Sequence, residues 1–292
     1  MNTELVASCP ICHHTEFIPW LTTQDHFFSK EQFHLVACAH CQFVITNPRP
    51  SESTIGKYYQ SEEYISHSDS RKTIQDKTYQ LARYYATRKK IKLIESYHQS
   101  GSILDIGCGT GELLQRMNPS KWTRVGIEPS NQARGKIATN ITVYPSFQDL
   151  PNKFQVISLW HVLEHLHQLE AAMTFIEKHL ANAGTLFIAV PNRESADAQH
   201  YGTHWAAYDT PRHLWHFTKE NMQALLHHFG FQIQAIRPMP LDAFYVCLLS
   251  EKYAHPESHF ATRAAKALYH GLTSNLRAGK DNYSSLLYIA SR

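Results

Sequence analysis

The stretch SILDIGCGTGELL, from Ser102 to Leu114, decides the fold of this 292-residue chain. A short apolar run ends at Asp105, and glycines at alternate positions, Gly107, Gly109 and Gly111, lead into helix-forming residues. Glycine suits this place because the turn needs unusual backbone angles and because a ligand can approach the bare backbone closely. The pattern therefore predicts the strand, turn and helix junction of a nucleotide-binding α/β sheet.

The chain that follows this junction alternates between short apolar runs and helical patterns. Such alternation predicts a doubly wound, mostly parallel, Rossmann-like sheet with helices on both faces. Strands are expected at Ile103–Ile106, Arg124–Ile127, Thr142–Tyr144, Val156–Trp160, Thr185–Val190, Phe231–Arg237 and Ser284–Ala290. Helices are expected near residues 78–98, 111–117, 131–139, 168–181, 219–229 and 260–272.

Composition indicates a globular protein that can bury a core, because 43% of the residues are hydrophobic. The net charge of +3, from 28 basic and 25 acidic side chains, is too small to indicate a polyanionic partner. No apolar run approaches the roughly 20 residues that span a bilayer, and the N-terminus lacks a secretory pattern. We therefore expect a cytoplasmic protein without a membrane partner.

Four of the six cysteines form two Cys-x-x-Cys pairs, Cys9 with Cys12 and Cys38 with Cys41. Two such pairs can bring four thiolates around one Zn²⁺ ion. A disulfide framework is opposed by a reducing cytosol, and a redox pair would not need the second copy. Residues 1–48 are therefore predicted to form a zinc ribbon, whose metal is structural because all four ligands are protein groups.

The glycine turn differs from a dinucleotide-binding turn at Glu112, which stands where that motif has its third glycine. An acidic side chain in the first helical turn suits a pyrophosphate poorly. S-adenosylmethionine carries a sulfonium and no phosphate, so it fits better. Its ribose needs a carboxylate at the end of the next strand, where the sequence GIEPS places Glu128.

Residues 102–237 resemble a class I S-adenosylmethionine-dependent methyltransferase, through LDIGCGTGELL, GIEPS, FQVISLWHVLEHL and GTLFIAVPN in this order. The resemblance implies a seven-stranded sheet and a set of cofactor contacts. It implies that Asp105 holds the amino group of the cofactor and that Glu128 binds the ribose. The methionine part would be lined by Gly107, Gly109 and Gly111.

The same resemblance implies that Trp160 and His161 close the pocket at the end of the fourth strand. Many relatives have an acidic residue after the third strand, at the adenine. This chain has Ser146 and Phe147 at that place, so Phe147 and the backbone are expected to contact the adenine instead.

The N-terminal cysteines resemble those of small-molecule methyltransferases, including sugar C-methyltransferases, in which a zinc module precedes a tyrosine-rich lid. By this resemblance residues 49–98 form a lid and helical linker, with Tyr58, Tyr59, Tyr64 and His67 in the lid. Residues 99–292 form the methyltransferase domain, with insertions near 192–217 and 240–282. The sugar enzymes have Glu-His shortly before Phe-Ser or Phe-Thr, whereas DTPRHLWHFT has Arg212 in place of that glutamate.

Methyl transfer needs an aligned acceptor and, for many acceptors, the removal of a proton. His213 is the expected general base because histidine titrates near neutral pH, with Tyr208 or His67 orienting it. Arg212 is a candidate anchor for an anionic substrate group. The alternative interpretation is a packed connection in which His213 bonds backbone carbonyl groups.

The expected acceptor is a small molecule, such as a sugar nucleotide or another metabolite. Aromatic and histidine-rich stretches at 51–69 and 200–217 are typical of a pocket with polar groups in apolar walls. An RNA methyltransferase is the alternative, but the ribbon and the short NPRP linker that ends at Pro50 offer only Lys30 and Arg49 as permanent cations. A non-catalytic protein that acts through its ribbon is disfavoured by the intact glycine turn and Glu128. The sequence does not indicate an oligomeric state.

Overall fold

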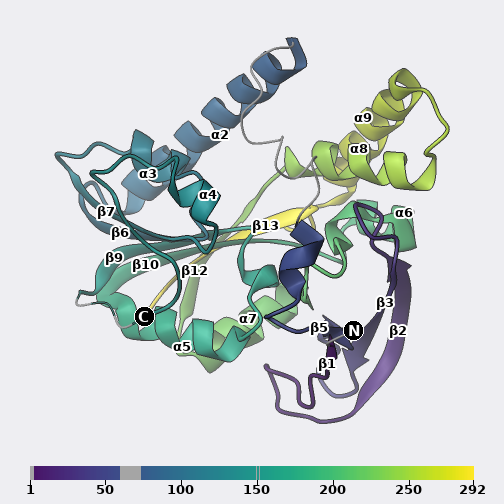
Figure 1. The fold of residues 1–292 in the computed structure, drawn as a ribbon, viewed down its shortest axis with the longest axis horizontal. Helices are drawn as coiled ribbons and strands as arrows, with labels where there is room; N and C mark the ends of the chain where they lie inside the picture. The colour runs from purple at the N-terminus through teal and green to yellow at the C-terminus, as the bar shows by residue number, and fades with distance from the viewer. Residues whose placement is uncertain (1–2, 60–73, 149, 151) are drawn as a thin grey trace.

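A central sheet of seven strands in the order β12-β13-β10-β9-β6-β7-β8 organises the chain (Figure 1). The structure is a computed structural model that describes residues 3–59, 74–148, 150 and 152–292, with only the backbone for 74–83. Every neighbouring pair in the sheet is parallel except the two that involve β13. The strands are β6 (Gly101–Ile106), β7 (Trp122–Ile127), β8 (Thr142–Tyr144), β9 (Phe154–Trp160), β10 (Leu180–Pro191), β12 (Gln232–Pro238) and β13 (Ser285–Ser291). The predicted doubly wound, mostly parallel sheet is confirmed.

Helices cover both faces of this sheet (Figure 1). One layer holds α2 (Ile74–Tyr97), α3 (Glu112–Arg116) and α4 (Asn131–Arg134), and the other holds α5 (Leu169–His179) and α7 (Lys219–His228). Side chains alternate along β6, so that Ile103 packs in one apolar core with Ile94, and Leu104 in another with Met173. The helix expected over 131–139 is shorter than predicted, because α4 ends before Gly135.

The N-terminal segment forms a smaller antiparallel sheet that is joined to the catalytic part of the chain. It contains β2 (Phe17–Gln24), β3 (Gln32–Cys38) and β4 (Val44–Thr46), while β1 (Thr3–Glu4) pairs separately with β5 (Arg49–Pro50). Its fourth strand, β11 (Trp215–His216), comes from the far larger C-terminal part. The ring of Phe43 stacks on Trp215, with centroids 6.1 Å apart. The ribbon core is therefore continuous with the core beneath the main sheet.

The remaining elements lie in connections that the sequence analysis treated as lid or insertions. Residues 192–217 hold α6 (Ala196–Tyr201), η3 (Gly202–His204) and η4 (Ala206–Tyr208). Residues 240–282 hold α8 (Asp242–Ala254) and α9 (Phe260–Arg277), and η1 (Ile55–Tyr59) and η2 (Leu163–His165) are short 3₁₀ turns. Within the described residues, none of the helices has the length and apolar character needed to cross a bilayer.

Candidate active site

The glycine turn leaves the carboxyl end of β6 and enters α3, as the sequence predicts. Gly107, Gly109 and Gly111 have φ values of 68°, 55° and 71°, which other residues rarely adopt. A β-carbon at Gly107 would lie 2.5 Å from Val162, and one at Gly111 would lie 3.0 Å from Ile137. A β-carbon at Gly109 would meet no atom within 4 Å beyond its chain neighbours. The turn is therefore tightly packed at both ends and open at its centre.

Two carboxylates lie next to this turn. Asp105, at its base, accepts a 2.6 Å hydrogen bond from the hydroxyl of Ser158, and burial raises the pKa of Asp105 to about 6. Glu128 follows β7 and accepts the N–H groups of Gly109 at 2.9 Å and Ser130 at 2.8 Å, through separate oxygens. Each oxygen keeps a second lone pair, so Glu128 can still accept two hydroxyl groups.

Trp160 and His161 stand at the end of β9, the strand beside β6. The ammonium of Lys90 lies 4.4 Å from the ring centroid of Trp160. His161 has a positive φ of 57°, and its Nε2 donates to Asp242 at 3.0 Å. Its Nδ1 lies 3.5 Å from the carboxylate of Glu164. Burial opposes the charge on His161, but these two carboxylates raise its pKa to about 10, so the ring is a cation at neutral pH.

Glu164 and His165 of η2 form a cluster with His213. One side-chain nitrogen or oxygen of each lies within 4.8 Å of the others. The N–H of Leu214 donates to the carbonyl of Glu164 at 2.8 Å, which holds the His213 segment against η2. The Glu164 carboxylate is fully buried, with the cationic ring of His161 3.5 Å away, and among the described residues neither oxygen accepts a hydrogen bond of normal geometry. His161 therefore balances the charge of Glu164, and the carboxylate keeps acceptor positions toward His213.

His213 has one ring nitrogen tied to the backbone and one available. Its Nδ1 lies 2.8 Å from the carbonyl oxygen of Ala207. A carbonyl only accepts, so Nδ1 carries the hydrogen and the Nε2 of a neutral ring holds the lone pair. Nε2 lies 4.0 Å from carboxylate oxygens of both Glu164 and Asp209. His213 therefore fits both interpretations, since it bonds a backbone carbonyl and still presents a basic nitrogen.

His165 is a neutral member of the cluster. Its Nδ1 lies 3.0 Å from the carbonyl of Arg212 and 3.1 Å from the hydroxyl of Tyr59. Burial, and then the nearby His213, lower the pKa of His165 to about 4. His165 is therefore neutral at neutral pH and is not expected to take up a proton.

The other predicted residues lie in different surroundings. The exposed ring of Phe147 meets Phe175 of α5 edge to face, with centroids 4.9 Å apart. Tyr208 is buried in an aromatic group, 4.9 Å from Trp205 and 5.7 Å from Trp20. His67 lies outside the described residues.

Arg212 is not available to anchor a substrate, which corrects the sequence-based expectation. Its guanidinium is 1% exposed and donates to Asp209 at 2.7 Å and to Asp25 at 2.8 Å. A further hydrogen bond of 3.1 Å reaches the carbonyl of Tyr58. Arg212 therefore fastens the ribbon and the end of η1 to the 192–217 segment.

Replacing Arg212 with methionine is expected to destabilise the protein by about 3–5 kcal/mol, because it leaves the buried carboxylate of Asp25 without a counter-charge. Urea unfolding measures this loss. The double variant Arg212→Met/Asp25→Asn should recover part of it, because the buried charge is then also removed. A single-variant loss below ~1 kcal/mol would show that the pair is not what fastens the ribbon.

The four predicted zinc ligands converge in the ribbon. The sulfurs of Cys9 and Cys41 lie 3.4 Å apart, those of Cys12 and Cys38 lie 3.5 Å apart, and all four lie within 4.8 Å. No pair is close enough for a disulfide, in which the sulfurs are about 2.05 Å apart. Each Cys-x-x-Cys pair lies in a similar turn. In the first turn the N–H of His13 donates to the carbonyl of Cys9, and in the second the N–H of Gln42 donates to the carbonyl of Cys38. Tetrathiolate zinc, with bonds of about 2.3 Å, fits this spacing.

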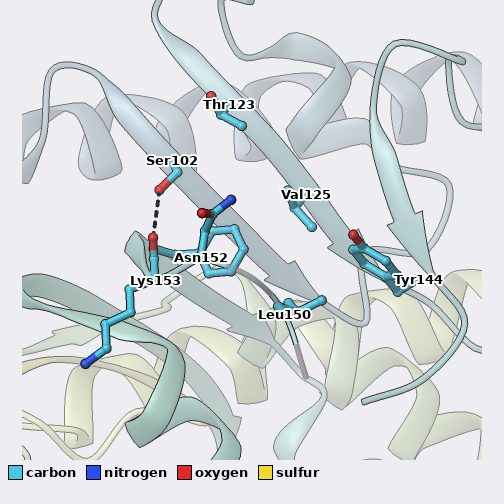
Figure 2. Close-up of a pocket in the computed structure, with 8 residues that line it drawn as sticks. Ser102, Thr123, Val125, Tyr144, Leu150, Asn152 and Lys153 are labelled. Carbon is cyan, nitrogen blue, oxygen red and sulfur yellow. Dashed lines mark hydrogen bonds between the residues drawn. The ribbon is translucent and has the colours of Figure 1, made fainter. Parts of the chain in front are cut away.

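A cavity of about 270 Å³ lies elsewhere on the sheet (Figure 2). It is lined by Ser102, Thr123, Val125, Tyr144, Leu150, Asn152, Lys153 and Phe154. Ser102 lies near the amino end of β6, and its hydroxyl donates to the carbonyl of Lys153 at 3.4 Å. The cavity includes none of the glycine turn, Glu128 or His213, so it is separate from the candidate active site.

Several residues of the site were not assigned from the sequence. Ser158 is a partner of Asp105, and Asp242 is a partner of His161, from strands and helices distant in the chain. Of these residues, Glu164 could have been identified from the local sequence. It lies among the apolar residues of LWHVLEHL, and a carboxylate is rarely buried unless it is paired.

A family model described as a methyltransferase domain matches residues 78–236, more than half of the chain. No curated protein sequence matches it significantly. A solved structure of magnesium protoporphyrin IX methyltransferase from Synechocystis PCC 6803, with bound SAH, gives a TM-score of 0.53 at 13% identity, covering 82% of this chain and 100% of that one.

Two further solved structures share the fold. The cyclopropane synthase MmaA2 from Mycobacterium tuberculosis gives a TM-score of 0.52 at 14% identity, covering 80% of this chain and 95% of that one. Coclaurine N-methyltransferase, bound to N-methylheliamine and SAH, gives a TM-score of 0.50 at 13% identity, covering 85% of this chain and 83% of that one. By the family match, and with a fold common to these enzymes, the chain belongs to the S-adenosylmethionine-dependent methyltransferases.

Proposed function

We propose that this protein transfers a methyl group from S-adenosylmethionine to a small-molecule acceptor. The observation that carries the proposal is the open centre of the glycine turn at Gly109, with Glu128 beside it. Bound there, the cofactor supplies a methyl carbon activated by its sulfonium. Glu128 would accept the ribose hydroxyls, Asp105 would hold the amino group, and Trp160 and His161 would close the pocket.

We place the acceptor next to the Glu164, His165 and His213 cluster. His213 would take the proton of the acceptor on Nε2, while the Ala207 carbonyl holds its Nδ1–H. Glu164 and Asp209, each 4.0 Å from Nε2, would stabilise the imidazolium that results. His165 would stay neutral and keep His213 in place by its perpendicular ring, with centroids 4.5 Å apart.

Two observations favour a small molecule over RNA as the acceptor. Arg49, one of two permanent cations in residues 1–50, is buried and donates to Glu4 at 2.7 Å and to the carbonyl of His167 at 2.9 Å. Its guanidinium is therefore enclosed by protein and does not reach a phosphate surface. Two of the solved structures with this fold are named for small substrates, magnesium protoporphyrin IX and coclaurine.

The experiment for this function is incubation of the protein with isotopically labelled cofactor and a metabolite extract. We expect one compound of low mass to gain the labelled methyl group with the wild type and not with His213→Ala. Label that enters total RNA, with no labelled small molecule, would contradict the proposal.

We further propose that the four ribbon cysteines hold one structural Zn²⁺ ion. The convergence of Cys9, Cys12, Cys38 and Cys41 supports it. The ion would fix the two turns of the ribbon, which β11 joins to the catalytic part. It would leave no position for substrate, because the protein fills all four.

Replacing Cys12 with serine is expected to remove the bound zinc and to lower the thermal midpoint, since the metal contributes folding energy. Metal content by mass spectrometry and a thermal melt measure both effects. Cys247→Ser is the matched control, because that buried cysteine lies in α8, away from the ribbon, and its replacement should leave zinc content unchanged. A wild-type protein without zinc, whose four ribbon thiols all react in the folded state, would refute the site.

A further inference from the structure

The outer side of α9 carries an apolar stripe that faces solvent. Leu268, Leu272 and Leu276 are spaced four residues apart, so they lie along one side of the helix. Their exposed fractions are 56%, 48% and 82%. The buried positions of α9 are Ala267, Gly271 and Ser274, which lie along a different side. Figure 1 shows α9 beside α8 at the rim of the molecule, beyond α6.

The exposed stripe is not the result of a loosely placed helix. A β-carbon at Gly271 would lie 2.6 Å from the ring of Phe244 in α8, so the two helices are in close contact there. The hydroxyl of Ser274 donates to the buried carboxylate of Asp197 at 2.6 Å. The amide of Asn275 donates to the carbonyl of Pro240 at 2.9 Å. These contacts hold α9 by its inner side and fix the leucines outward.

Exposed apolar side chains are concentrated in this part of the molecule. Within the described residues, seven of the thirteen large hydrophobic side chains that are exposed lie between Leu241 and Leu276. A contiguous apolar patch on a protein surface marks a contact with a partner or a membrane more often than it occurs by chance. The stripe on α9 therefore needs an occupant.

The charges of this segment identify the kind of occupant. From Phe260 to Lys280 the sequence contains no acidic residue and four permanent cations, Arg263, Lys266, Arg277 and Lys280. At 100° per residue, Lys266 and Arg277 fall into one row, roughly 120–140° around the helix from the middle of the leucine stripe. Lys266 also lies 3.9 Å from the carboxylate of Glu251 in α8. A helix with an apolar face and a basic polar face is typical of segments that lie on an anionic lipid surface.

A second copy of this chain fits the stripe less well. Two α9 helices packed through their leucines would leave the row of Lys266 and Arg277 outside the contact, with no negative charge of the partner helix to bind. The phosphates of a lipid surface supply that negative charge, and the acyl region accepts the leucines. Tyr269, which is 63% exposed beside the stripe, has the apolar ring and polar tip that suit the boundary between the two.

We propose that the outer side of α9 binds the surface of an anionic phospholipid bilayer, with the helix lying in the plane of the interface. This proposal differs from the sequence-based expectation of a protein without a membrane partner, which rested on the lack of a spanning segment. The proposal is independent of the methyl-transfer chemistry.

The test is co-sedimentation of the full-length protein with vesicles of phosphatidylcholine, alone or mixed with phosphatidylglycerol. We expect binding to the mixed vesicles that weakens with added salt. The double variant Leu272→Glu/Leu276→Glu should bind the mixed vesicles at least about tenfold more weakly than the wild type. The double variant Arg277→Glu/Lys280→Glu, which replaces two positive charges by two negative ones, should also bind the mixed vesicles more weakly than the wild type. Leu5→Glu is the matched control, because Leu5 is 75% exposed outside α9, and it should bind as the wild type does.

A thermal melt of each variant shows whether it keeps its fold, so that a lost vesicle interaction is not mistaken for unfolding. Wild-type protein that binds neither kind of vesicle would overturn the proposal. Equal binding by the leucine variant would overturn it too. So would a wild-type dimer in sedimentation equilibrium that the leucine variant abolishes, without vesicle binding, since the occupant would then be a second copy.

Discussion

Replacing Glu128 with alanine is expected to weaken the binding of S-adenosylmethionine about 100-fold to 10,000-fold. The carboxylate would accept both ribose hydroxyls, and each hydrogen bond to a charged group contributes about 1.5–3 kcal/mol, so roughly 3–6 kcal/mol is lost in all. The substitution also frees the N–H of Gly109, which Glu128 accepts at 2.9 Å. Isothermal titration calorimetry with SAH measures the change.

Glu112→Ala is the control for this prediction. It removes an acidic side chain from the same turn region, but that carboxylate pairs with Arg116 at 3.2 Å. We expect its cofactor affinity to stay within about threefold of the wild type. Unchanged affinity in Glu128→Ala would show that the ribose is held elsewhere.

Replacing His213 with alanine is expected to lower the turnover of the true acceptor about 100-fold to 10,000-fold, the range typical of a general base. The affinity for SAH should stay the same, because His213 lies in the cluster with Glu164 and His165 and not in the glycine turn. Single-turnover kinetics measures the first effect and calorimetry the second.

His213→Asn separates a base from a structural histidine. Asparagine can still donate a hydrogen bond to the carbonyl of Ala207, but it has no basic nitrogen. We expect it to be as slow as His213→Ala while melting closer to the wild type. If His213→Asn turns over within about threefold of the wild type, His213 is part of a packed connection and not a base.

The elements of the main sheet could be predicted because their signals are local. The run before Asp105 and the three glycines indicate β6 and its turn, and the structure gives all three glycines the positive φ that this turn requires. Strands buried on both faces are continuous apolar runs, so Val156 to Trp160 is evident without knowledge of its neighbours. The convergence of four cysteines likewise follows from spacing alone.

The site required contacts that no local pattern contains. Arg212 and Asp25 are separated by 187 positions, so the sequence did not show that the arginine is already neutralised. The pairing of β11 with β4, which joins the 192–217 segment to the ribbon, is equally distant in sequence. For the same reason the role of the buried Glu164 carboxylate becomes clear only when the fold places His213 4.0 Å from it.

The central claim is that the nucleoside of the cofactor lies over Gly109 with its ribose on Glu128, and a crystal structure of the protein with SAH tests it most directly. We predict density for the thioether nucleoside at the open centre of the turn, with both ribose hydroxyls within hydrogen-bond distance of the Glu128 carboxylate. Density in the separate cavity lined by Ser102 and Tyr144, with the glycine turn empty, would contradict the account.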